Sequence, residues 1–176
     1  MSAVATGVKQ AVKCIKRRDP SLVTLGMFGC QYEDSDIDEL VDCLIACPNI
    51  VACVYLGQNR LTDRTGIKLA WYVAASSTLQ ELSLYRNQFG EATYLAIAAA
   101  LRVNTSLQYL DLNYNKEVDQ TRIYAAFVEA LRLNPRPAGS VMYLHKIRFN
   151  DEYSRLEARA IELGHPTLQM LLVDRC

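Results

Sequence analysis

The sequence lacks long apolar runs, an excess of charge of either sign, and a supply of histidine. No apolar stretch approaches the roughly 18 residues of a membrane-spanning helix, so we expect no membrane partner. Lysine and arginine together number 19, and aspartate and glutamate together also number 19. This balance removes the electrostatic basis for nucleic-acid binding, which needs a basic stripe. We therefore expect neither a nucleic acid nor a membrane as partner.

Residues that commonly carry out catalysis or bind metals are also scarce. Neither of the two histidines, His145 and His165, lies near a serine or cysteine in the context of an activated nucleophile, and no G-x-S-x-G motif or phosphate-binding glycine loop occurs. Cys43 and Cys47 lie one helical turn apart, but a zinc site needs a second matching pair, which is missing. We predict that the protein is not an enzyme and holds no metal and no cofactor.

The six cysteines do not indicate a disulfide scaffold. A chain of 176 residues with 51 % apolar content can bury a sizeable core without covalent cross-links. The first residues also lack the apolar segment of a secretory signal. Both observations favour a reducing compartment, and we predict a cytoplasmic protein.

One pattern recurs along the chain at a fixed interval. Residues 79–89 read L-x-x-L-x-L-x-x-N-x-F, and the same spacing occurs 28 residues earlier and later, with Asn59, Asn87 and Asn115 at the shared position. Less regular copies extend the series in both directions. The predicted units start near residues 22, 51, 79, 107, 144 and 168. A period of this length indicates an array of stacked structural units.

This pattern resembles that of the leucine-rich repeat proteins of the ribonuclease-inhibitor-like type, which have 28 or 29 residues per repeat. The resemblance implies an α/β fold, a right-handed solenoid forming a horseshoe segment, with parallel strands on the concave face and helices on the convex face. We expect residues 1–176 to form a single domain and residues 1–19 to form an N-terminal capping helix. Because residues 1–18 are basic and contain no acid, a mitochondrial targeting segment is the alternative interpretation.

Each unit is predicted to contain a short strand, a turn at the asparagine and an amphipathic helix. The later helices are predicted over residues 62–75, 90–103, 119–133 and 151–163. The asparagine amides should bond backbone groups of neighbouring turns, which would otherwise lack partners. Cys30 takes the asparagine position in the first unit, where we expect it to be buried.

The strand positions between the buried leucines are predicted to form a binding surface. Side chains alternate along a strand, so these positions face solvent on the concave side. They are rich in aromatic residues, and tyrosine and arginine dominate the hot spots of protein interfaces. The predicted partner-binding residues are Phe28, Tyr55, Glu81, Tyr85, Arg86, Tyr109, Asp111, Asn113, Tyr114, Lys146 and Arg148.

We predict a non-catalytic protein–protein interaction module, a scaffold that binds a protein partner through its concave face. Two alternatives follow from the resemblance. One is a regulator of a small GTPase, similar to proteins that activate Ran, with Arg86 as the contributed arginine. The other is a cytoskeletal domain similar to actin filament-capping proteins of the tropomodulin kind. The sequence given stops at Cys176, at the end of the last predicted strand, so association through an open C-terminal end is also expected.

Overall fold

The computed structural model describes residues 3–134 and 143–145. Their helices and strands alternate along the chain. In order, these elements are β1 (Ala3–Ala5), α1 (Val8–Lys16), β2 (Leu22–Gly26), α2 (Asp34–Ala46), β3 (Cys53–Tyr55), α3 (Asp63–Ala75), β4 (Glu81–Ser83), α4 (Glu91–Leu101), β5 (Tyr109–Asp111), α5 (Gln120–Leu133) and β6 (Tyr143–His145).

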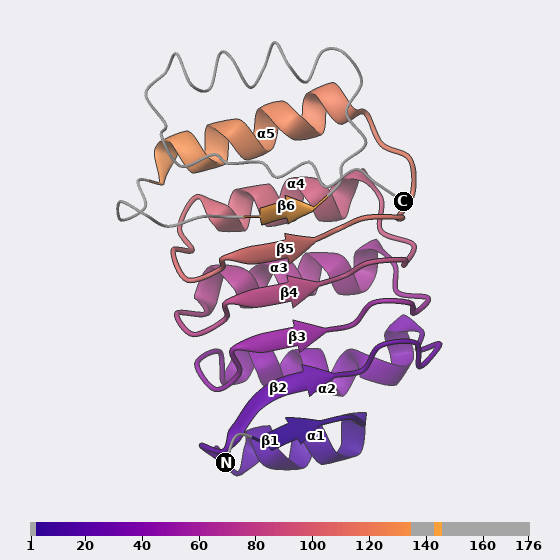
Figure 1. Ribbon diagram of the computed structural model, residues 1–176, viewed down its shortest axis with the longest axis vertical. Coiled ribbons are helices and arrows are strands. Elements are labelled where there is room, and N and C mark those ends of the chain that lie inside the picture. Colours follow the sequence, from indigo (N-terminus) through magenta and orange to yellow (C-terminus); the bar gives the residue numbers. More distant parts are fainter. Residues whose placement is uncertain (1–2, 135–142, 146–176) are drawn as a thin grey trace.

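The strands form one parallel sheet of six, in which their spatial order follows the chain. The helices of the described residues lie together on one face of this sheet (Figure 1). Such a layer is expected because two neighbouring parallel strands need a long crossover between them, usually a helix. None of the described helices is both long and apolar enough to cross a bilayer. The predicted α/β fold with a parallel sheet is thus confirmed.

The core lies between the sheet and the helix layer. The central residues of β3, β4 and β5 are Val54, Leu82 and Leu110, and all three are buried. They pair with one another in register across the sheet, so equivalent residues of successive units stack. Leu69 and Ile97 complete the packing from α3 and α4. Each unit therefore buries its apolar side chains largely against its neighbours.

The first residues differ from the predicted capping helix over residues 1–19. Ala3–Ala5 forms β1, which pairs with β2 in parallel, and only Val8–Lys16 is helical. Gly7 has an extended backbone at the start of α1 and separates the two elements. Val4, which lies within the predicted capping helix, is instead on the strand and is 53 % exposed. The sheet thus extends one strand further than the sequence pattern indicated.

The pattern asparagines form the predicted ladder at the edge of the sheet where the strands end. The Asn87 side chain donates to the carbonyl oxygens of Leu56 at 2.9 Å and Leu84 at 3.1 Å. Its own oxygen accepts a backbone N–H from the preceding unit. Asn59 and Asn115 make equivalent bonds. The ladder satisfies turn backbone groups that would otherwise lack partners.

A second ladder, which the sequence analysis missed, lies at the opposite edge, where the strands start. The Asn104 side chain donates to the carbonyl oxygens of Val73 and Ser76, both at 2.7 Å. Asn134 repeats the arrangement one unit later and bonds Leu101 and Asn104, again at 2.7 Å. Only 2 % of Asn104 and 7 % of Asn134 is exposed. Buried amides thus tie each helix end to the next.

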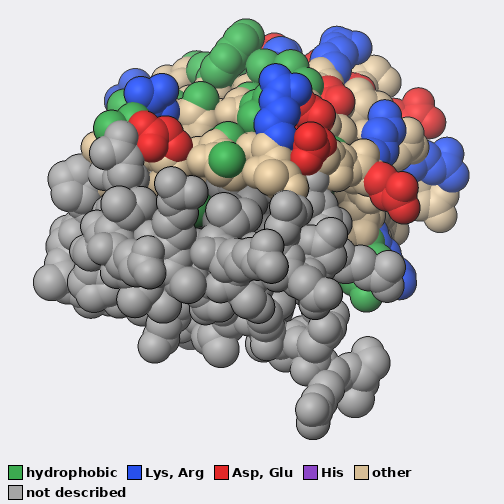
Figure 2. Space-filling view, turned by 90° about the horizontal axis from the view of Figure 1, so that it is seen from above, with side chains coloured by type: hydrophobic (Ala, Val, Ile, Leu, Met, Phe, Trp, Pro, Cys, Tyr) green, Lys and Arg blue, Asp and Glu red, His purple; other side chains and the backbone are tan. Residues whose placement is uncertain are grey.

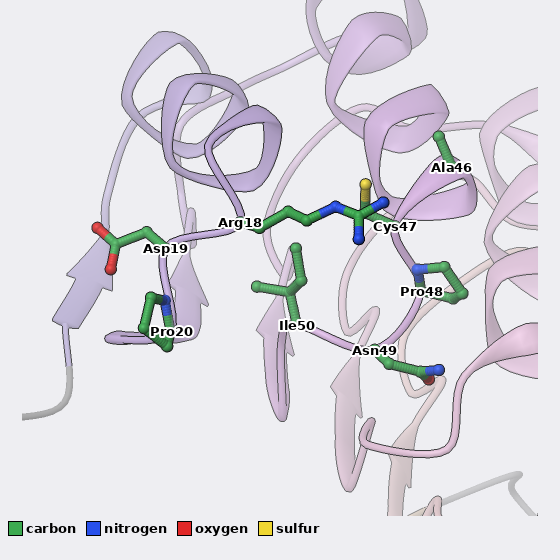
Figure 3. A pocket seen from close by; sticks show the side chains of 8 residues that line it. All are labelled: Arg18, Asp19, Pro20, Ala46, Cys47, Pro48, Asn49 and Ile50. Atoms are coloured by element: carbon green, nitrogen blue, oxygen red, sulfur yellow. The ribbon is translucent and has the colours of Figure 1, made fainter.

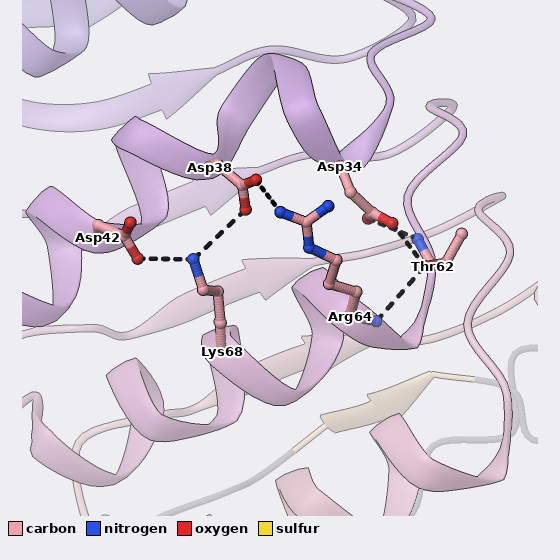
Figure 4. A network of polar contacts seen from close by, with 6 residues as sticks. All are labelled: Asp34, Asp38, Asp42, Thr62, Arg64 and Lys68. Atoms are coloured by element: carbon pink, nitrogen blue, oxygen red, sulfur yellow. Dashed lines mark hydrogen bonds and ion pairs between the residues drawn. The ribbon is translucent and has the colours of Figure 1, made fainter.

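Polar contacts also join neighbouring helices, as Figure 4 shows for α2 and α3. The Asp34 carboxylate accepts the backbone N–H of Thr62 at 2.9 Å and also the Thr62 hydroxyl. Lys68 pairs with Asp42 at 2.7 Å and with Asp38 at 3.3 Å. Acidic and basic side chains are interspersed over the described surface seen from the α5 end of the molecule (Figure 2). That surface carries no broad field of one sign.

Cys30 is exposed, which corrects the prediction that it is buried at the asparagine position. Its thiol approaches the Phe28 carbonyl oxygen at 3.7 Å. The Asn59 side chain reaches across from the next unit to the Met27 carbonyl oxygen and accepts the Tyr32 backbone N–H. Because Asn59 already bonds these groups of the first turn, the Cys30 thiol is not needed there.

Candidate functional site

The face of the sheet opposite the helices carries half of the strand side chains. The central residues of β3, β4 and β5 point into the core, so their neighbours point to this other face. Tyr55, Glu81 and Tyr109, which we predicted to bind a partner, lie here and are half-buried. We call this surface the open sheet face. On the three central strands its residues are Cys53, Tyr55, Glu81, Ser83, Tyr109 and Asp111.

A hydrogen bond links two of these side chains across neighbouring strands. The Tyr55 hydroxyl donates to a carboxylate oxygen of Glu81. This bond, together with burial, raises the pKa of Tyr55 above its ordinary value. The phenol therefore remains protonated at neutral pH, and the pair presents a carboxylate beside a tyrosine ring.

The structure places Asp111 and Asn113 differently from the prediction. We expected both to face solvent, but only 9 % of Asp111 and 6 % of Asn113 is exposed. One Asp111 carboxylate oxygen accepts the Asn113 backbone N–H at 3.0 Å, and the other accepts the Tyr109 hydroxyl at 3.4 Å. Burial, and then the charge of Asp111, raises the pKa of Tyr109 to about 12. The prediction of exposure was wrong for Asp111 because its carboxylate turns back to bond the backbone of the turn after β5.

Exposed rings gather at the edge where the strands end. The rings of Phe28 and Tyr85 are stacked with their centroids 6.4 Å apart, and Tyr114 meets Tyr85 edge to face at 5.2 Å. The guanidinium carbon of Arg86 lies 5.3 Å from the ring centroids of both tyrosines. Phe28 is 54 % exposed and Tyr114 is 62 % exposed. We call these four predicted binding residues, which the structure brings together, the edge cluster.

Gly57 allows Phe28 and Tyr85 to meet although β3 lies between their strands. A β-carbon at Gly57 would lie 2.9 Å from the Phe28 ring and 3.2 Å from the Tyr85 carbonyl oxygen. A β-carbon there would force the ring or the neighbouring turn to shift, so glycine is the residue that leaves room for the ring in its observed place. The sequence analysis assigned Gly57 no role, and the structure shows that it supports the edge cluster.

The backbone at this edge is left-handed at the equivalent position of four successive turns, and the first of these turns has a second left-handed residue, Gln31, with a φ of 57°. The φ angles are 71°, 55°, 49° and 54° at Gly29, Gln58, Arg86 and Tyr114. Residues other than glycine seldom adopt such angles. Neighbouring turns hold the conformation, since the Arg86 N–H donates to the Asn113 carbonyl oxygen at 2.9 Å. Arginine and tyrosine thus occupy positions where glycine would be the least strained choice.

The remaining predicted features are only partly placed. Lys146 and Arg148 lie outside the described residues, as do His165, Cys176 and the predicted sixth unit. In the described ranges, no group of three or more histidine, cysteine or acidic side chains is arranged to hold a metal ion. The five cysteines within those ranges are free thiols.

A hollow of about 500 Å³ lies at the opposite edge, beside the segments that lead into β2 and β3. Arg18 reaches from the segment after α1 toward the residues that follow α2, among them Cys47 (Figure 3). The carboxylate of Asp19, which also lines the hollow, accepts the backbone N–H and hydroxyl of Ser21, and these bonds lower its pKa. The hollow adds no residue to the edge cluster.

Comparisons with known proteins find similarity at the level of the fold alone. No protein-family model matches the chain, and no curated protein matches it. The fold is similar to a solved structure described as leiomodin-1 Actin-Binding Site 2, with a TM-score of 0.70 and 17 % identity, covering 88 % of this chain and 87 % of that one. It is also similar to the tropomodulin C-terminal domain of Caenorhabditis elegans, with a TM-score of 0.54 and 13 % identity, covering 88 % and 98 %.

These findings correct the predicted family. The structural neighbours are leiomodin and tropomodulin domains, and no family model supports a ribonuclease-inhibitor-like leucine-rich repeat protein. That prediction, and the description as a leucine-rich repeat scaffold, were wrong. The periodic leucines and asparagines are needed for the packing of successive strands and turns. Such a packing pattern does not by itself identify a family.

Proposed function

We propose that this protein is a non-catalytic actin-binding domain. The observation that supports the proposal is the likeness of its fold to leiomodin-1 Actin-Binding Site 2 over 88 % of this chain and 87 % of that one. The likeness favours the cytoskeletal alternative over both the unspecified interaction module and the regulator of a small GTPase. An actin-binding role also agrees with the predicted cytoplasmic location.

In this proposal the strands and helices form a right-handed α/β solenoid that continues through residues 1–176 as a single domain. The parallel strands would line a concave face and the helices a convex one. Because each unit packs against its neighbours, such an array presents side chains of several units as one rigid surface. A rigid surface loses little conformational entropy when it binds a partner.

The proposed contact surface consists of the edge cluster and the open sheet face. Tyrosine and arginine offer large contact areas with polar tips, which suits them to the centre of a protein interface. Asp111 and Asn113 would support this surface from beneath, since both are buried. The proposed contact residues are Phe28, Tyr55, Glu81, Tyr85, Arg86, Tyr109 and Tyr114, with Lys146 and Arg148 as further predicted contacts.

Cosedimentation with filamentous actin and gel filtration with monomeric actin test the proposal. We expect saturable binding in at least one assay, and weaker binding by a variant that combines Tyr55→Ala, Tyr85→Ala and Tyr109→Ala. Circular dichroism would verify that this variant is folded. Trp71→Ala is the matched control, because Trp71 is 59 % exposed but lies on α3, in the helix layer. If the wild type binds neither form of actin, the proposal is wrong.

A further inference from the structure

We propose that the edge cluster anchors a partner segment that presents a carboxylate beside an apolar side chain. The carboxylate pairs with the Arg86 guanidinium, and the apolar side chain lies against the exposed rings of Phe28 and Tyr114. This inference deepens the proposed function and rests on it in taking the partner to be a protein.

Arg86 is an exposed cation that the described part of the chain does not neutralise. No carboxylate of the described residues forms an ion pair with it. By contrast, Arg64 pairs with Asp38 in the helix layer. Arg122 pairs with Glu91 in the same layer. A guanidinium without such a partner keeps its N–H donors available for a two-pronged bond to a carboxylate.

The neighbouring rings hold this guanidinium in place. Its carbon lies 5.3 Å from the ring centroids of both Tyr85 and Tyr114, which are the distances of cation–π contacts. A planar guanidinium can keep ring contacts while its edge donates hydrogen bonds, whereas a lysine ammonium has no planar fork. Because these contacts already restrict the side chain, pairing with a carboxylate costs it little further freedom.

The backbone at Arg86 does not require an arginine side chain. Arg86 has a φ of 49°, which is a left-handed conformation. Gly29, at the equivalent position of the turn after β2, has a φ of 71°. Bulky residues in such conformations cluster at binding sites, where the surrounding structure holds the strain. Here the Asn113 carbonyl oxygen holds the Arg86 N–H at 2.9 Å. The turn therefore needs its backbone bonds but does not need an arginine.

The exposed rings explain why the partner needs an apolar group as well. An ion pair on an exposed surface contributes little, because water and salt screen it. Phe28 and Tyr114 are 54 % and 62 % exposed and lie on either side of Tyr85 within the edge cluster. An apolar side chain packed on these rings would exclude water from the neighbouring ion pair, as the rim of a hot spot does.

The test compares Arg86→Gly with Gln58→Gly, the same left-handed position one unit earlier, where φ is 55°. Glycine suits both positions, so both variants should fold. In cosedimentation with filamentous actin, we expect Arg86→Gly to weaken binding roughly tenfold and Gln58→Gly to leave it unchanged. Arg86→Lys should recover only part of the affinity. If the wild type pellets and both glycine variants pellet equally well, the inference is wrong while the proposed function stands.

A second experiment does not depend on actin. It tests the carboxylate site at Arg86 even if the wild type fails to pellet. The probe is N-acetyl-Glu-Leu amide at millimolar concentration, compared with N-acetyl-Gln-Leu amide, and the readout is the NMR resonances of Arg86 Nε–H and the Tyr114 ring. We expect the glutamate peptide to shift both resonances in the wild type, with no such shift of Tyr114 in Arg86→Gly. Equal shifts from the two peptides, or none from either, would overturn the inference. Shifts from the glutamate peptide, in a wild type that binds neither filamentous nor monomeric actin, would refute only the proposed function.

Discussion

At both edges of the sheet, asparagine side chains form hydrogen bonds with backbone groups, but the two edges expose different side chains. Asn59, Asn87 and Asn115 bond the turns where the strands end, and Asn104 and Asn134 bond the helix ends where the strands start. Among the described residues, the large apolar side chains that this strand-start edge exposes next to its asparagines are scattered and aliphatic. These are Val103 and Leu133.

The strand-end edge instead exposes the edge cluster, two members of which are held at positive φ. Single exposed aliphatic residues are ordinary on protein surfaces, whereas clustered rings around a cation are not. We infer that the strand-start edge serves stability and the strand-end edge serves binding. The following predictions would separate these two roles.

Asn104→Ala should cause the largest loss of stability. The substitution leaves the carbonyl oxygens of Val73 and Ser76 without their amide donor and the Leu107 N–H without its acceptor, all at a buried site. We expect the free energy of unfolding to fall by about 3 kcal/mol, measured by urea denaturation.

Asn49→Ala is the matched control at the same edge. Asn49 is exposed and accepts the backbone N–H and hydroxyl of Ser77. Water can replace these bonds, so we expect a loss below about 1 kcal/mol. Equal losses in Asn104→Ala and Asn49→Ala would show that the buried ladder does not stabilise the strand-start edge.

Tyr114→Val should be less stable than Tyr114→Gly by about 1.5 kcal/mol. Both variants lose the ring, but a β-branched residue is strongly disfavoured at the φ of 54° found here. Thermal and urea unfolding would measure the difference. At Gln80, which is exposed and has no positive φ, valine should instead equal or exceed glycine in stability. The same order at both positions would contradict the strained backbone at the strand-end edge.

The 28-residue period predicted the middle of the fold well because it reflects contacts between adjacent units. Leu82 is buried and Asn87 bonds the preceding unit, as their positions in the pattern require. The first strand escaped prediction because Ala3–Ala5 carries no leucine pattern, and only its pairing with β2 makes it a strand. Asn104 was missed because it lies before the leucine and asparagine pattern of its unit, which starts near residue 107. The sequence also gives no sign of which helix ends its amide will bond.

The site was predicted less completely, because alternation along a strand assigns a face but not an environment. It identified Tyr55 and Tyr109 on the open sheet face, yet it could not show that Asp111 is buried by its own turn. The sequence did contain one sign of the left-handed turn positions. Gly29 directly precedes Cys30, just as Arg86 directly precedes the pattern asparagine of its own unit. One glycine among four residues was too little to indicate the backbone without the structure.

Mild acid should weaken the contacts of Asp34 at the strand-end edge before it weakens the Asn104 contacts at the strand-start edge. Burial tends to raise the pKa of Asp34, but hydrogen bonds from Thr62 outweigh it, and the pKa lies below its ordinary value of 3.8. A carboxyl whose pKa is depressed on folding adds stability above its unfolded pKa, and this stability is lost as the pH falls through the folded pKa. The wild type should therefore lose more stability than Asp34→Asn between about pH 5 and pH 3.

Hydrogen exchange would locate this loss. The Thr62 N–H donates to the Asp34 carboxylate, whereas the Leu107 N–H donates to the amide oxygen of Asn104, which does not titrate in this range. We expect Thr62 to lose protection at a higher pH than Leu107, after correction for intrinsic exchange rates. Simultaneous loss at both residues would mean that the two edges open as one unit.

Arg86→Gly should have the smallest effect on stability, within about 1 kcal/mol of the wild type. Glycine relieves the strain of a φ of 49°, but it makes the unfolded chain more flexible and removes the contacts with Tyr85 and Tyr114. Gln58→Gly should behave alike in urea denaturation, although among the described residues it removes no cation–π contact. A loss above about 2 kcal/mol for Arg86→Gly alone would make the arginine part of the scaffold. A small loss beside a large drop in binding would instead assign Arg86 to the partner, because a side chain that the fold can spare is retained for what it contacts.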